Sequence, residues 1–291
     1  MPAGQDPART VDGAADAPDA PRVNAAADPK DQKAGPQRKP GGGFVVVDEA
    51  QNRADARAFM SSQSLVAAGR VDDALQVLRP LARAPVTTVQ AHAAVVASAL
   101  LTTRGQEGDA AEALAFVDGI PPGASIDQGM VLMIRAQILR RLGRADDAVA
   151  AAVASCAHGS TPERVVVLAS AQRQAGRLDD AIATLEGARS TGTADVVDVA
   201  DVAVLGHLAA YLALAGRRSA SDAVMTILRG ACADGDADGW RQLALALACR
   251  DDVVAAQAAL NKALDLDETT TRRWFADDDL LARRGLHLAS G

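Results

Sequence analysis

The chain has 291 residues, of which 49% are hydrophobic and 2% aromatic, and its formal net charge is −7 at pH 7. An acidic chain without a basic stripe is a poor match for nucleic acid, so we expect no nucleic-acid partner. No stretch approaches the roughly 18 apolar residues of a membrane span, and the first residues contain no apolar run typical of a secretory signal. We therefore expect a cytoplasmic protein with no membrane partner and a core of small side chains.

Residues 1–43 are rich in Ala, Pro, Asp and Gly, contain no aromatic residue and end in Pro40 and three glycines. Such a segment buries too little apolar surface to offset the entropy lost on ordering. We predict a disordered N-terminal arm, either a plain linker or a weak contact for an acidic partner through its Lys and Arg residues. The apolar residues 44–47 are expected to pack on the first helix.

One motif, Gly-Arg-x-Asp-Asp-Ala, occurs at residues 69–74, 143–148 and 176–181, and a looser copy begins at Gly216. With a turn at 105–108 and an Arg-Asp-Asp turn at 250–252, successive turns lie 33 to 40 residues apart. Such periods indicate stacked helical hairpins. The glycine is suited to end one helix in the left-handed conformation, and an aspartate is expected to cap the next helix.

In the helices between these turns the apolar residues recur at the spacing of one helix face. Leu178, Ala181, Ile182 and Leu185 follow the i, i+3, i+4, i+7 spacing of one helix face. The preceding helix opens with Thr-Pro-Glu at 161–163, which predicts a Thr cap and a proline in the first helical position. Pro80 should kink or shorten its helix. The sequence therefore predicts an all-α solenoid of about six antiparallel helix hairpins.

With these turns and this period, residues 50 to 265 resemble tetratricopeptide repeat (TPR) proteins. The matching features are the turn glycine, a small residue five positions later (Ala74, Ala148, Ala181) and a large apolar residue four beyond that (Leu78, Leu185). The tail resembles the closing segment of many bacterial proteins of this family. The resemblance implies a TPR-like superhelix over 44–267 and a C-terminal capping helix over 268–291. Trp274 and Phe275 are expected in the core of that cap, or alternatively facing a ligand.

No catalytic constellation is found, so we expect neither an enzyme nor a cofactor. Residues 187–192 have the outer glycines of a phosphate loop, but Thr193 stands where the lysine must be. The four histidines are far apart, and the three cysteines lack CxxC spacing, so we interpret the cysteines as small core residues.

A calcium-like loop is the nearest approach to a metal site. Asp234, Asp236 and Asp238 place oxygen donors at alternate positions, but Leu245 stands where the bidentate acid is required. We therefore predict no metal, and instead a polar loop in which Asp236 or Asp238 caps a helix starting near Trp240.

In tetratricopeptide arrays the first helix of each hairpin lines a groove that takes a peptide or a partner helix. The resemblance therefore implies a partner-binding face here, made of Met130, Met133, Gln137, Arg140, Val166, Ser170 and Arg173. Arg140 and Arg173 lie one repeat apart and can grip a carboxylate, or can simply be solvated. We expect a non-enzymatic protein-interaction scaffold, monomeric or weakly homo-oligomeric. The alternatives are a structural self-associating protein and an accessory subunit of an enzyme complex.

Overall fold

The computed structural model describes residues 48–83, 87–190, 199–232, 235–278 and 280–288. The predicted arm at 1–43 and the apolar residues 44–47 lie outside the described residues. The described part consists of thirteen α-helices and one short 3-10 helix, with no strand among the residues described. The all-α prediction is confirmed.

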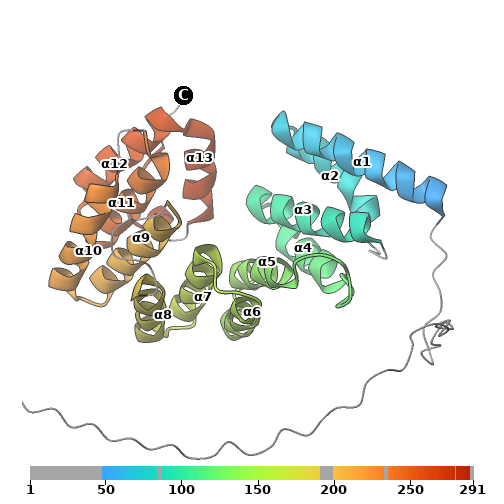
Figure 1. The fold of residues 1–291 in the computed structure, drawn as a ribbon. Helices are drawn as coiled ribbons and strands as arrows, with labels where there is room; N and C mark the ends of the chain where they lie inside the picture. The colour runs from blue at the N-terminus through green and yellow to red at the C-terminus, as the bar shows by residue number, and fades with distance from the viewer. Residues whose placement is uncertain (1–47, 84–86, 191–198, 233–234, 279, 289–291) are drawn as a thin grey trace, which may run out of the picture. The chain divides into compact units, whose positions relative to one another are not determined.

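The helices follow one another with short connections, labelled in Figure 1. They are α1 (Glu49–Ala67), α2 (Val71–Ala82), α3 (Thr88–Arg104), α4 (Asp109–Asp118), α5 (Gln128–Arg141), α6 (Ala145–Ala157), α7 (Pro162–Gln174), α8 (Leu178–Ser190), α9 (Val199–Leu214), α10 (Arg218–Ala231), α11 (Ala237–Cys249), α12 (Val253–Leu266), α13 (Glu268–Asp277) and the 3-10 helix η1 (Leu281–Arg283). Of the described helices, none combines the length and apolarity that crossing a membrane requires.

The repeated turns have one backbone geometry. Their glycines adopt positive φ angles of 72° to 77°, which a side chain at Cβ disfavours; they are Gly69, Gly143, Gly176 and Gly216. In each turn the N–H of the following arginine donates to a carbonyl five residues earlier, as Arg177 does to Gln172 at 2.8 Å. The sixth turn uses Asp251, with φ 65°, in place of glycine. The predicted role of the turn glycine is therefore confirmed.

The predicted capping by the turn aspartates is confirmed at the sixth turn, where Asp252 caps α12 by accepting from the N–H of Ala255 at 3.2 Å, and is wrong at the turns before α2, α6 and α10. The cap positions of α2, α6 and α10 are occupied by arginines that make no side-chain cap hydrogen bond, namely Arg70, Arg144 and Arg217. In α2 and α6 the aspartates lie one and two residues inside the helix instead. There their negative charge is stabilised by the positive end of the helix dipole.

Two other local predictions match the structure. Thr161 caps α7 by accepting from the N–H of Arg164, with Pro162 in the first turn. On the predicted apolar face of α8, Ala181, Ile182 and Leu185 are fully buried. Pro80 lies inside α2, which ends at Ala82, and the kink or shortening expected from it stays a prediction.

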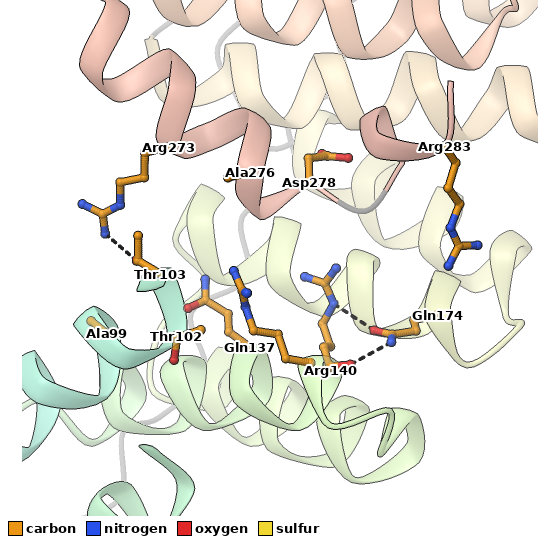
Figure 2. Close-up of a pocket in the computed structure, with 11 residues that line it drawn as sticks. Ala99, Thr102, Thr103, Gln137, Arg140, Gln174, Arg273, Ala276, Asp278 and Arg283 are labelled. Atoms are coloured by element: carbon orange, nitrogen blue, oxygen red, sulfur yellow. Dashed lines mark hydrogen bonds between the residues drawn. The ribbon is translucent and has the colours of Figure 1, made fainter. Parts of the chain in front are cut away.

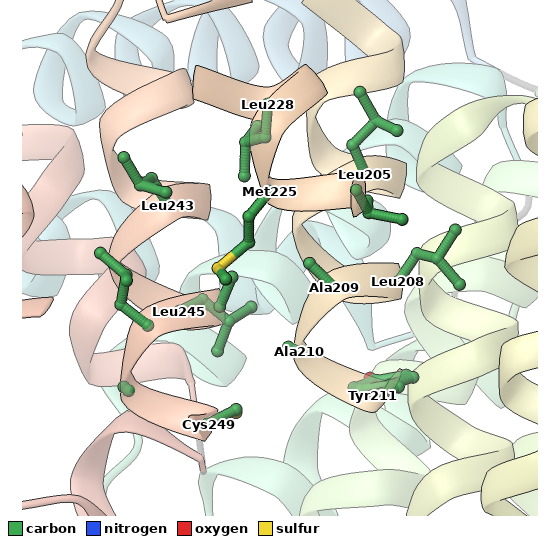
Figure 3. Packing of buried hydrophobic residues seen from close by; sticks show 14 of the residues in the cluster. Leu205, Leu208, Ala209, Ala210, Tyr211, Met225, Leu228, Leu243, Leu245 and Cys249 are labelled. Atoms are coloured by element: carbon green, nitrogen blue, oxygen red, sulfur yellow. The ribbon is translucent and has the colours of Figure 1, made fainter. Parts of the chain in front are cut away.

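The largest cluster of buried apolar residues extends over α7 to α12 (Figure 3). Its fully buried members include Leu208, Tyr211, Met225, Leu228 and Leu245. Trp274 and Phe275 pack against this cluster with their side chains partly exposed, and Leu281 and Leu286 are buried in it. The C-terminal segment is thus held by the core of the last helices.

Helix α13 contacts α12 and also α3, a helix far earlier in the chain. The contact with α3 includes a hydrogen bond from Arg273 Nη2 to Thr103 Oγ1 at 3.1 Å. Helix α13 is therefore anchored to α3 as well as to α12.

Candidate partner-binding site

Two adjoining cavities lie between the C-terminal segment and the helices α3, α5, α7 and α9. The first, here called the tyrosine cavity, has a volume of about 290 Å³. It is lined by Gln137, Arg140, Glu163, Val166, Val167, Ser170, Arg173, Ala203, His207, Tyr211, Gln242, Trp274, Asp278 and Leu280. The second, the arginine cavity, has a volume of about 480 Å³ and is described below.

Five of the seven residues predicted to bind a partner line the tyrosine cavity. They are Gln137, Arg140, Val166, Ser170 and Arg173. Met130 and Met133 line neither cavity, since both pack against apolar clusters formed with neighbouring helices. The structure thus brings the polar members and Val166 together and leaves out the two methionines.

Ser170 differs from its predicted place on an exposed face. Its side chain is buried, and its Oγ lies 3.0 Å from the hydroxyl of Tyr211, which belongs to α9. The guanidinium of Arg173 lies 5.8 Å from the centre of the Tyr211 ring, within the range of a cation–π contact. Burial raises the pKa of the Tyr211 phenol above its ordinary value, so the hydroxyl keeps its proton.

His207, one turn before Tyr211 on α9, forms an edge-to-face contact with the Tyr211 ring at 5.9 Å between centroids. Its Nδ1 lies 2.9 Å from the carbonyl oxygen of Ala203. Because that oxygen can only accept, Nδ1 carries the proton. Burial lowers the pKa of His207, and the nearby carboxylate of Asp278 opposes this effect. The imidazole is thus neutral at pH 7.

Gln242, on α11, contributes a polar atom with no partner. Its side chain is 5% exposed, and its Oε1 has no hydrogen-bond partner among the described residues. A buried acceptor without a partner costs free energy. A ligand that offers an N–H to this atom would recover that cost.

The arginine cavity lies between α3, α5 and α7 on one side and α13 with η1 on the other (Figure 2). Its lining residues are Ala99, Thr102, Thr103, Gln137, Arg140, Arg141, Gln174, Arg273, Ala276, Asp278 and Arg283. Arg140 and Gln174 are joined by two hydrogen bonds, from Arg140 Nε to Gln174 Oε1 at 3.3 Å and from Gln174 Nε2 to the Arg140 carbonyl at 2.8 Å.

Asp278 lines both cavities. Its Oδ1 accepts from the backbone N–H groups of Leu280 and Leu281 at 2.8 and 3.2 Å. These bonds fix the turn into η1. A carboxylate of the chain itself therefore stands at the junction of the two cavities.

At the calcium-like loop one of the two predicted aspartates occupies the cap position of the next helix, but without the cap hydrogen bond. Asp234 lies outside the described residues, and α11 begins at Ala237, earlier than predicted, with Asp236 in the cap position but making no side-chain cap bond. The Asp238 carboxylate accepts from Nε of Arg241 at 3.1 Å. Among the described residues no three His, Cys, Asp or Glu side chains are grouped to hold a metal ion.

The three cysteines are free thiols. Burial raises the pKa of Cys232 to about 11 and that of Cys249 to about 12, and it also raises that of Cys156. At neutral pH these thiols stay protonated, the form that is a poor nucleophile.

Tyr211, His207, Gln242 and the C-terminal arginines were not predicted as site residues. The sequence offers a signal for Tyr211, because it is the only tyrosine of the chain and lies in an apolar helix. No protein-family model matches the chain, and no curated protein matches it significantly. The function is therefore inferred from the residues and cavities themselves.

Proposed function

We propose that the chain is a TPR-like solenoid of about six antiparallel hairpins that serves as a non-enzymatic scaffold. Support comes from the helix order, in which α1 to α12 form six consecutive pairs, each joined by a short turn, and in which both helices of a pair are in contact. The recurrence of one turn geometry at Gly69, Gly143, Gly176 and Gly216 supports the same arrangement.

The scaffold binds an extended peptide in the tyrosine cavity. The observation that carries this proposal is the convergence, in that cavity, of five predicted binding residues with the Oε1 of Gln242, which has no hydrogen-bond partner among the described residues. A peptide backbone supplies an N–H for Gln242, and its carbonyl or carboxylate oxygens can accept from Arg140 and Arg173. Val166 and Leu280 offer contact to an apolar side chain.

The hydroxyls of the cavity favour binding over catalysis. The Ser170 Oγ faces the Tyr211 phenol, whose raised pKa keeps it protonated, so this neighbour does not serve as a base for Ser170. Activation of a serine requires a base within hydrogen-bond reach. The pair is suited to holding α7 against α9 at the wall of a peptide site.

Affinity capture with the immobilised full chain tests the proposal. We expect native partners to be retained by the wild type and lost with the double variant Arg140→Ala/Arg173→Ala. A matched control is Arg189→Ala/Arg229→Ala, because both of these arginines are exposed on second helices, away from the cavity. Equal capture by wild type and the cavity variant, with both folded by circular dichroism, rules out this binding site.

A further inference from the structure

We propose that the arginine cavity binds an acidic segment of the partner peptide through guanidinium–carboxylate pairs. This inference rests on the proposed function and specifies the chemistry of its ligand. The cavity adjoins the tyrosine cavity, and both are lined by Gln137, Arg140 and Asp278. One extended peptide can therefore occupy both.

The charge of the lining is the first argument. Among the described residues that line the arginine cavity are four arginines, Arg140, Arg141, Arg273 and Arg283, and one carboxylate, Asp278. This positive group stands in a chain whose formal net charge is −7. Guanidinium groups match carboxylates with two parallel hydrogen bonds, so arginine is suited to this recognition.

The arginines come from opposite walls. Arg140 and Arg141 lie in the last turn of α5, whereas Arg273 and Arg283 belong to α13 and η1. Figure 2 shows the side chains of Arg140 and Arg283 extending into the space between these walls. Thr103 holds Arg273 through the 3.1 Å hydrogen bond, and Gln174 holds Arg140. Groups fixed in this way lose less entropy when a ligand binds.

The volume and the neighbouring cavity favour a peptide over a small anion. About 480 Å³ lies within the range of ordinary ligand sites and exceeds the need of a single phosphate. The adjoining tyrosine cavity adds apolar contacts from Val166, Val167 and Leu280. A ligand with acidic side chains followed by an apolar one satisfies both cavities. The net negative charge of the whole chain opposes nucleic acid as the source of the anion.

Asp278 places a carboxylate at the wall of the arginine cavity. It belongs to a run of three aspartates, 277–279, that precedes Leu280 and Leu281. Its negative charge lies at the wall of the same cavity, so it opposes the entry of an acidic ligand. Removal of that charge is expected to strengthen binding of an acidic peptide.

The experiment measures fluorescence anisotropy of a labelled peptide Gly-Asp-Glu-Asp-Leu-Leu with the full chain at low and high salt. Its counterpart, Gly-Asn-Gln-Asn-Leu-Leu, has the same shape without the side-chain charges, and both peptides carry an amidated C-terminus. We expect the acidic peptide to bind at least about tenfold more tightly than the amide peptide, the scale of charge-assisted hydrogen bonds. The difference should shrink at high salt.

Two sets of variants locate the binding. Arg141→Gln/Arg283→Gln alters only the arginine cavity and should weaken binding of the acidic peptide about tenfold, whereas the control Arg189→Gln/Arg229→Gln should leave it unchanged. Asp278→Asn keeps an oxygen to accept from Leu280 and Leu281 and removes the charge, so it should strengthen binding. If the double variant unfolds, the single Arg283→Gln replaces it.

Equal binding of the acidic and amide peptides, or full binding by the Arg141→Gln/Arg283→Gln variant, overturns the inference. Inorganic phosphate is the third probe, and binding of phosphate alone with the same arginine dependence identifies a small-anion site, which also overturns it. Partner capture separates the two proposals. Capture lost with Arg140→Ala/Arg173→Ala but unaffected by Arg141→Gln/Arg283→Gln leaves the scaffold standing and removes the acidic-segment site.

Discussion

Nη2 of Arg177 donates to Oδ1 of Asp146, 31 residues earlier in the chain, at 2.7 Å. The pair joins the arginine of one turn to the first aspartate of the preceding turn motif. The same link recurs along the chain, in the pairs Arg104–Asp72, Arg217–Asp179, Arg250–Asp222 and Arg284–Asp251. The repeated motif therefore connects neighbouring turns as well as shaping each one.

Each exposed link of this series should contribute little on its own. The side chains of Arg177 and Asp146 are 42% and 90% exposed, so water and salt screen their attraction. We expect Asp146→Ala to lower the free energy of unfolding by less than about 1 kcal/mol, measured by urea denaturation. A loss of several kcal/mol would show that the link is cooperative along the chain.

Asp109 presents the contrasting case of a buried ion pair. Its carboxylate receives two hydrogen bonds from Arg104, at 2.9 and 2.6 Å, and its side chain is 5% exposed. We expect Asp109→Asn to lower the free energy of unfolding by about 3 kcal/mol, because it leaves the Arg104 charge without its buried partner. Asp73→Asn, in the exposed pair with Arg70, is the matched control and should cost less than about 1 kcal/mol.

The Arg104–Asp109 pair should also make the free energy of unfolding depend on pH in the acid range. The Arg104 guanidinium lowers the pKa of Asp109 below its ordinary value. A carboxyl group whose pKa is lowered by folding stabilises the protein above its unfolded pKa, and this stabilisation disappears as the pH falls through the folded pKa. The difference in unfolding free energy between wild type and Asp109→Asn should therefore shrink below about pH 4. A difference independent of pH contradicts this explanation.

The close approach of α9 and α11 can be tested at a glycine. A Cβ added to Gly206 would lie 2.5 Å from Gln242 Cβ, whereas a Cβ at Gly187, in α8, would have no atom of the described residues within 4 Å. Alanine favours a helix over glycine by about 1 kcal/mol. We expect Gly187→Ala to raise the melting temperature and Gly206→Ala to lower the free energy of unfolding by about 1–3 kcal/mol. Equal effects of the two substitutions would contradict the packing described.

Sequence analysis predicts those features that depend on residues close together in the chain. The left-handed glycines and the buried face of α8 follow from local conformational preference and from helical spacing. Tyr211 and Ser170 lie 41 residues apart, and their pairing depends on how α9 packs on α7, which local patterns do not encode. The aspartates of the turns before α2 and α6 miss the cap position because both helices begin one residue before the first aspartate, with an arginine as the cap residue.

The C-terminal segment shows the same limit at a larger scale. The sequence predicts that this segment is helical and that its aromatic residues pack on the last helices. The contact of Arg273 with Thr103 joins residues 170 positions apart, so no spacing in the sequence points to it. The arginine cavity depends on this contact, and therefore only the α5 and α7 half of the site is predictable.

His207 should make the stability of the chain sensitive to mild acid. Burial lowers its pKa in the folded chain, against the opposing effect of Asp278 and with Arg140 and Arg173 adding to the lowering. In the unfolded chain the imidazole takes up a proton near pH 6.5. Protonation therefore favours the unfolded state, and the free energy of unfolding contributed by this group falls as the pH drops below about 6.5, until the folded pKa is reached.

The variant His207→Gln isolates this effect from that of the carboxylates. Glutamine has no proton to gain, and it can still donate a hydrogen bond to the Ala203 carbonyl. We expect the unfolding free energy of wild type to decrease more steeply than that of His207→Gln between pH 7 and pH 5, in urea titrations at each pH. His287→Gln, at an exposed position, is the control for the replacement of a histidine by glutamine. Parallel pH profiles for wild type and His207→Gln would show that the imidazole titrates alike in the folded and unfolded chains.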